Sequence, residues 1–150
     1  QYYIISKEFL HILVDYSTLH LMTPKIKKQI LLIEDEHAIA SLYKFKLELH
    51  NLEVIHAQNG LEGLKMIKTN IPNLILLDLR MPIMDGEEFL RKFRKEELHS
   101  DIPVLILTNI SRDEAPKTLW HYGISGYFVK AHHTPADLYS QVMNVLDQQQ

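Results

Sequence analysis

The sequence contains no cysteine among its 150 residues. This absence excludes a disulfide scaffold and thiolate metal sites, and it agrees with a reducing compartment. No uninterrupted apolar run approaches the roughly 20 residues that a membrane helix requires. No window carries the clustered Lys and Arg that nucleic acid or anionic lipid would demand. We therefore expect a cytoplasmic protein that contacts neither nucleic acid nor a membrane directly.

Phosphate-binding loop motifs are also missing, because neither G-x-x-x-x-G-K-[ST] nor G-x-G-x-x-G occurs in the chain. This argues against a nucleotide-binding enzyme. The formal net charge is −3 and 46% of the residues are hydrophobic. Such a composition is typical of one globular domain, and the length is sufficient for a sizeable core.

Five short apolar runs alternate with segments of helical periodicity. The runs predict strands at residues 30–33, 54–57, 74–77, 104–107 and 127–129. Apolar residues three and four apart predict a helix after each strand. The predicted apolar faces are Ala38/Leu42/Phe45/Leu49, Leu61/Leu64/Ile67, Phe89/Leu90/Phe93, Ala115/Leu119 and Leu138/Val142/Val145/Leu146. Short connections and right-handed crossovers then predict an α/β fold, a three-layer, doubly wound (βα)5 sandwich around a parallel five-stranded sheet.

Turn and capping residues mark the expected helix starts. Asn59-Gly60 precedes the second helix, Gly86 opens the third, and Thr134-Pro135 supplies a cap and a first-turn proline for the last. For the fourth helix we expect Asp113 as the cap, which places Pro116 in the first turn, where its missing N–H matters little.

The two ends of the chain are set apart from this pattern. Residues 1–27 form an N-terminal extension of uncertain status: Ile5, Phe9, Ile12, Leu13, Tyr16 and Leu19 recur near helical spacing. A short amphipathic helix and a leader extraneous to the domain remain alternatives, since Met22 reads as a natural start. The domain proper spans residues 28–147, and residues 148–150 are expected to fray.

Polar residues follow four of the five predicted strands. They are Glu34 and Asp35 after the first, Asp78 after the third, Thr108 after the fourth and Lys130 after the fifth. Carboxyl ends of parallel strands share one edge of a sheet, so these side chains are expected to converge on Asp78. Clustered carboxylates repel one another unless a cation neutralises them, and Mg²⁺ suits such an all-oxygen site. Asp78 would then act as a nucleophile towards a phosphoryl group, with Lys130 and Thr108 holding the transferred charge.

Four motifs carry a resemblance to a known family. They are Leu31-Leu-Ile-Glu-Asp35, Leu76-Leu-Asp-Leu-Arg-Met-Pro-Ile-Met-Asp-Gly86, Leu105-Ile-Leu-Thr108 and Tyr127-Phe-Val-Lys130. With them, residues 28–146 resemble a response-regulator receiver domain of two-component signalling. The resemblance implies a flavodoxin-like sheet in the order 2-1-3-4-5. It also implies that Asp78 accepts a phosphoryl group from a histidine kinase or a histidine phosphotransfer protein.

The same resemblance implies roles for individual residues. Asp35 and Asp78 would ligate Mg²⁺ directly, Glu34 largely through water, and Arg80 through its backbone carbonyl. Thr108 and Tyr127 would form a switch, with Tyr127 rotating into the space that Thr108 vacates. The face around Trp120, His121 and Tyr127 would bind an unknown downstream protein, and the family also allows a homodimer that forms on phosphorylation.

Some positions depart from the family pattern. Ala131 stands where Pro commonly follows the lysine, and Asn109 where Ala or Gly commonly follows the threonine. Arg80 and Ile110 are expected to flank the route of the attacking water. Together these residues leave the lifetime of the phosphorylated form open.

We expect a signalling module rather than an enzyme, and one without an attached effector, because little chain follows Leu146. A receiver-like module that binds partners without phosphorylation is one alternative. A phosphatase with an aspartyl nucleophile, of the haloacid dehalogenase type, is a weaker one, since it needs a second Asp where Arg80 stands.

Overall fold

The computed structural model describes residues 27–148, except residues 97, 98 and 100. Its centre is a parallel five-stranded sheet in the order β2-β1-β3-β4-β5. The strands are β1 (Gln29–Ile33), β2 (Glu53–Ala57), β3 (Leu74–Leu77), β4 (Val104–Thr108) and β5 (Gly126–Val129). The predicted sheet is therefore confirmed, with each strand end within one residue of its expected place. The expectations for residues 1–26, and for the last two residues of the tail, lie outside the described residues.

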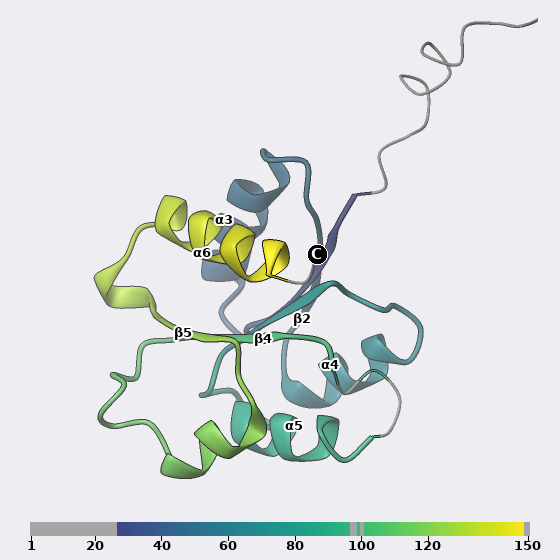
Figure 1. Cartoon of the computed structure of the whole chain (residues 1–150), viewed down its shortest axis with the longest axis vertical. Coiled ribbons are helices and arrows are strands. Elements are labelled where there is room, and N and C mark those ends of the chain that lie inside the picture. Colours follow the sequence, from purple (N-terminus) through teal and green to yellow (C-terminus); the bar gives the residue numbers. More distant parts are fainter. Residues whose placement is uncertain (1–26, 97–98, 100, 149–150) are drawn as a thin grey trace, which may run out of the picture.

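Helices cover both faces of the sheet (Figure 1), as the three-layer prediction requires. On one face lie α3 (His37–Glu48) and α6 (Pro135–Asp147), and on the other α4 (Gly60–Ile67) and α5 (Gly86–Phe93). Successive residues of a strand point to opposite faces. Leu31 and Ile33 of β1 accordingly pack in the core with α4 and α5, while Ile30 and Leu32 pack in the core with α3 and α6. Within the described residues, no helix has the length and apolar character needed to cross a membrane.

The predicted apolar face of α3 is wrong. Leu42, Phe45 and Leu49 are 48%, 64% and 63% exposed, whereas Ala40, Tyr43 and Leu47 are buried. The buried set has the same three- and four-residue spacing as the predicted one. Apolar residues thus occupy two faces of this helix, so periodicity alone does not select the face that packs on the sheet.

The predicted fourth α-helix is also wrong. Residues Ser111 to Ala115 form a single turn, in which the Ala115 N–H donates to the Ser111 carbonyl at 3.1 Å. Pro116 then adopts an extended ψ of 128°, and the 3₁₀-helix η1 (Lys117–Tyr122) follows it. Proline lacks an N–H and disfavours a helical conformation in the residue before it, so it divides this connection instead of lying in a first turn. The expected anchors Ala115 and Leu119 are nevertheless buried.

The other helix starts are confirmed. The side chains of Asn59 and Asp85 accept hydrogen bonds from the N–H groups of Glu62 and Glu88, at the starts of α4 and α5. Thr134 caps α6 in a reciprocal capping box with Asp137, followed by Pro135. A further 3₁₀ turn, η2 (Lys130–His132), joins β5 to this cap.

Candidate functional site

The carboxyl edge of the sheet carries the polar residues that the sequence places after the strands. Glu34 follows β1 and Asp78 follows β3, and these strands are paired through Ile33 and Leu77. Thr108 ends β4, and Lys130 follows β5. Glu34, Asp78 and Thr108 are buried, at 1%, 6% and 1% exposure, while Asp35 is exposed. The structure therefore brings all five predicted residues to one hollow of about 490 Å³.

Lys130 joins the two buried carboxylates of the hollow. Its ammonium lies 2.7 Å from Oε2 of Glu34 and 2.8 Å from Oδ2 of Asp78. Burial alone would lower the pKa of Lys130, but the hydrogen bonds and charges of Asp78 and Glu34 outweigh it, and the net effect raises the pKa. Lys130 is thus held as a cation beside Asp78.

Asp78 is oriented from both of its oxygens. Oδ1 accepts the N–H of Leu79 at 2.6 Å and that of Arg80 at 3.3 Å, while Oδ2 accepts Lys130. The close packing of the backbone behind it requires a glycine, because a Cβ at Gly86 would lie 2.3 Å from the Asp78 carbonyl oxygen. These contacts fix the carboxylate at the bottom of the hollow.

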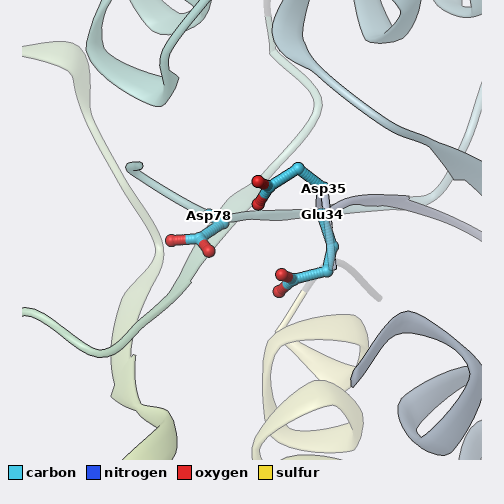
Figure 2. A group of neighbouring side chains, drawn as sticks. All are labelled: Glu34, Asp35 and Asp78. Atoms are coloured by element: carbon cyan, nitrogen blue, oxygen red, sulfur yellow. The ribbon is translucent and has the colours of Figure 1, made fainter. Parts of the chain in front are cut away.

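The acidic residues have the arrangement of a cation site. Figure 2 shows the carboxylates of Glu34 and Asp35 extending towards the side chain of Asp78. One oxygen from each lies within 4.8 Å of the others. Burial, as the largest influence, raises the pKa of Glu34, and the charge of Asp78 raises it further, although Lys130 opposes both. A hard divalent cation would relieve this cost, so the donor set fits Mg²⁺. Arg80 lines the same hollow.

Thr108 and Tyr127, the two residues predicted to form a switch, both contact the loop after β4. Oγ1 of Thr108 accepts the Ile110 N–H at 3.4 Å. Tyr127 is buried, and its hydroxyl donates to the carbonyls of Ile110 at 2.9 Å and Ser111 at 3.4 Å. Burial raises the pKa of Tyr127. Thr108 and Tyr127 therefore hold the same loop.

An aromatic and cationic cluster extends from Tyr127 to the surface. The ring of Trp120 lies 5.6 Å from that of Tyr127, and Trp120 is 40% exposed. The guanidinium of Arg112 lies 5.0 Å from the Trp120 ring and 6.0 Å from the Tyr127 ring. The contact with Arg112 follows from the irregular loop, and no motif of the sequence indicated it.

Other residues of the hollow agree only partly with expectation. Asn109 and Ile110 line it, as the departures from the family pattern suggested. Glu36 and Glu114 line it as well, and the sequence analysis missed both. Glu36 stands two residues after Glu34, and this position close to the end of the first strand could have indicated that it lines the hollow. Glu114 reaches the hollow from a turn of irregular conformation, for which no spacing rule exists.

Taken together, the fold and the hollow define an α/β domain with a lysine-bridged acidic pocket around one aspartate, at the edge where open parallel sheets place their ligands. The chain belongs to the response regulator receiver domains, since the model of that family matches residues 30–142. Receiver domains are signalling modules and not classical enzymes, as expected.

Similar proteins agree with this assignment. The chain is 36% identical to ycf27 of Porphyridium aerugineum, named as a probable transcriptional regulator, over 80% of this chain and 48% of that protein. It is 37% identical to histidine kinase P4 of Formosa agariphila, over 73% of this chain and 8% of the kinase. A CheY-like receiver domain protein from Methanospirillum hungatei superposes with a TM-score of 0.73 at 32% identity, over 82% of this chain and 96% of that one. The chain thus spans about half the length of the first of these relatives.

Proposed function

We propose that this domain accepts a phosphoryl group on Asp78 from a phosphohistidine of a histidine kinase or phosphotransfer protein. A carboxylate oxygen of Asp78 attacks the phosphorus, the phosphorus–nitrogen bond breaks, and the imidazole leaves with the electron pair and takes up a proton. The observation that carries the proposal is the double contact of Lys130 with Asp78 and Glu34. It holds a cation beside the carboxylate that receives the phosphoryl group, where the cation can stabilise the negative charge of the phosphoryl oxygens during transfer.

Glu34, Asp35 and Asp78 would hold Mg²⁺, together with the Arg80 carbonyl, and the ion would supply positive charge to the phosphoryl oxygens. The protein's own residues have separate roles. The backbone N–H groups of Leu79 and Arg80 orient Asp78. Lys130 stabilises the transferred charge, and the Thr108 hydroxyl donates to a phosphoryl oxygen.

Phosphorylation would act on the loop after β4. The new group adds about −1.5 to −2 charge units and three acceptor oxygens. We propose that Thr108 turns towards the phosphoryl group and loses its hydrogen bond with the Ile110 N–H. The Tyr127 side chain then breaks its hydrogen bonds to the carbonyls of the loop and rotates into the space that Thr108 has left. Trp120 and His121 lie on the adjoining surface, where a downstream protein would bind or a phosphorylated homodimer would form.

We further propose a cytoplasmic location, supported by the absence of cysteine. The relative named as a transcriptional regulator raises the question of DNA contact. We propose that the matched region itself makes none. Four basic residues do lie within residues 91–95, but Arg91 and Lys92 form ion pairs with Glu88, and Arg94 donates hydrogen bonds to backbone carbonyls.

The test is incubation with magnesium and acetyl phosphate, followed by intact-mass measurement. One added phosphoryl group is expected, and Asp78→Asn should abolish it. Asp101→Asn, an exposed aspartate outside the hollow, is the matched control and should still be modified. Sustained turnover of phosphoesters would favour a phosphatase, and a wild-type protein without adduct would favour a module that binds partners without phosphorylation.

A further inference from the structure

Arg112 is an exposed cation that lies over aromatic rings. Its guanidinium lies 5.0 Å from the Trp120 ring and 6.0 Å from the Tyr127 ring. It forms no salt bridge with any carboxylate that the structure describes. The face of an aromatic ring attracts a cation electrostatically. Arg112 therefore covers part of the single tryptophan of the chain, which remains 40% exposed.

Trp120 itself is held in place by the neighbouring residues of η1. The Thr118 hydroxyl donates a hydrogen bond to Glu87 of α5. Arg94, which caps the end of α5, donates to the Tyr122 carbonyl at 2.8 Å. These two bonds tie η1 to α5 on either side of the tryptophan. The indole is thus a fixed surface, and its cover depends on where Arg112 lies.

The turn that carries Arg112 is closed by its own hydrogen bonds. The Ser111 hydroxyl donates to Glu114 at 2.8 Å, and the Ala115 N–H donates to the Ser111 carbonyl at 3.1 Å. Arg112 lies inside this turn, directly after Ser111. A displacement of Ser111 should therefore move Arg112 as well.

Ser111 and the residue before it are connected to the two switch residues. The Tyr127 hydroxyl donates to the carbonyls of Ile110 at 2.9 Å and Ser111 at 3.4 Å, and Oγ1 of Thr108 accepts the Ile110 N–H at 3.4 Å. In the proposed switching step, all three of these hydrogen bonds break. The turn then loses the contacts that place Arg112 over the rings.

We propose that Arg112 covers Trp120 while Asp78 is unphosphorylated, and that phosphorylation withdraws this cover from the surface to which a downstream protein binds. This inference rests on the proposed function of Asp78. A cation–π contact at an exposed site changes an equilibrium only about two- to five-fold. The cover therefore disfavours partner binding before phosphorylation, and it is weak enough to open when the loop loses its hydrogen bonds.

The test follows the exposure of Trp120 by acrylamide quenching of its fluorescence, with intact mass measured on the same samples. Acrylamide is neutral, so the loss of a charge at residue 112 does not itself alter its encounter with the ring. Without a phosphodonor, Arg112→Gln should raise the quenching constant about two-fold over the wild type, because the cover is lost. With magnesium and acetyl phosphate, the constant of the wild type should rise towards the same value, and that of Arg112→Gln should rise clearly less.

Two variants serve as controls. Arg91→Gln removes an exposed arginine from α5 and should behave as the wild type in both conditions, while Asp78→Asn should show no rise with the phosphodonor. Equal constants for the wild type and Arg112→Gln without the donor, or equal rises with it, would overturn the role of Arg112 even where Asp78 is phosphorylated. A wild-type protein without an adduct would instead refute the proposed function and, with it, the release of the cover.

Discussion

Lys130 is the residue whose loss should cost most at the site. It is 9% exposed and forms ion pairs with two carboxylates that are 1% and 8% exposed, so its removal leaves buried negative charge without a partner. Breaking a buried ion pair from one side typically destabilises by about 3–5 kcal/mol. We expect Lys130→Met to lower the free energy of unfolding by that amount in metal-free buffer, measured by urea unfolding followed by circular dichroism.

Lys92 provides the control for Lys130→Met. Its ammonium lies 2.9 Å from Glu88, but both side chains are about 40% exposed. Exposed pairs contribute about 0–1 kcal/mol, so Lys92→Met should change the stability only within that range. Equal losses for the two variants would show that the contacts of Lys130 are not a buried ion pair.

Ile83 should be a site of stored backbone strain. It has a φ of 70° and its side chain is 76% exposed, so a β-branched residue occupies the left-handed region without burying its apolar surface. The left-handed conformation costs a residue with a Cβ roughly 1–2 kcal/mol, and glycine reaches it freely but loses about 0.5–1 kcal/mol of chain entropy. Ile83→Gly is therefore expected to raise the free energy of unfolding by up to about 1 kcal/mol.

Ile71 tests whether that gain comes from the backbone. It is 62% exposed, and it is not among the residues with positive φ in the described part of the chain. Ile71→Gly should therefore lower the stability or leave it unchanged, measured by the same denaturant unfolding. If Ile71→Gly raised the free energy of unfolding as much as Ile83→Gly, the gain would come from removing an exposed apolar side chain and not from relief of backbone strain.

Among the elements, α3 shows what periodicity can and cannot predict. The position and length of the helix follow from its sequence, but two apolar faces compete for the sheet and only the packed structure distinguishes them. Tyr43 and Leu47 are 4% and 0% exposed, whereas Phe45, between them, is 64% exposed. Leu47→Ala should cost about 2–5 kcal/mol, and Phe45→Ser should stay within about 0.5 kcal/mol, both measured by thermal unfolding. A large loss of stability in Phe45→Ser would instead show that the face predicted from the sequence packs on the sheet.

The connection after β4 was predictable in part. Ala115 and Leu119 are buried as expected, since both point to the core whichever kind of helix carries them. The sequence did not reveal that Pro116 ends one turn and precedes a separate 3₁₀-helix. A proline in the first turn of a helix and a proline just before a helix give the same sequence pattern. The result is a short 3₁₀-helix held against its neighbours by side chains.

Arg112 is one of those side chains, and its contact can be followed through Trp120, the single tryptophan of the chain. A cation over an aromatic ring at an exposed site contributes about 0.5–1 kcal/mol. Arg112→Gln should lower the stability by that amount and should shift the emission of Trp120 to longer wavelength as the ring becomes more exposed. Arg91→Gln, on the exposed part of α5, should leave the emission unchanged.

At the scale of the whole molecule, the sheet explains why so much of the site was visible in the sequence. Glu34, Asp78 and Lys130 each come directly after a strand, and parallel pairing brings the ends of neighbouring strands together. Their convergence could be predicted from strand positions alone. Glu114 and Arg112 reach their partners through a loop without regular structure, whose path depends on contacts made only in the folded chain.

The buried acids should also make the stability of the whole domain depend on pH and magnesium. The pKa of Glu34 lies above its usual value of 4.5 in the folded protein, chiefly through burial. The native state therefore binds more protons than the unfolded chain between pH 4.5 and that raised pKa. Without metal, the contribution of Glu34 to stability falls as the pH rises through this window, and Glu34→Gln should remove this slope.

Magnesium should act in the opposite direction, because it binds the deprotonated carboxylates of the native state. A ligand at a hundred times its Kd adds about 2.7 kcal/mol to the free energy of unfolding. The rise in Tm on adding magnesium should therefore increase from pH 4.5 towards neutrality. Asp35→Asn should reduce the rise, because it removes one of the three carboxylates that converge in the hollow. A rise that is independent of pH and equal in Asp35→Asn would mean that magnesium stabilises the domain elsewhere, and that Lys130 alone balances the acids around Asp78.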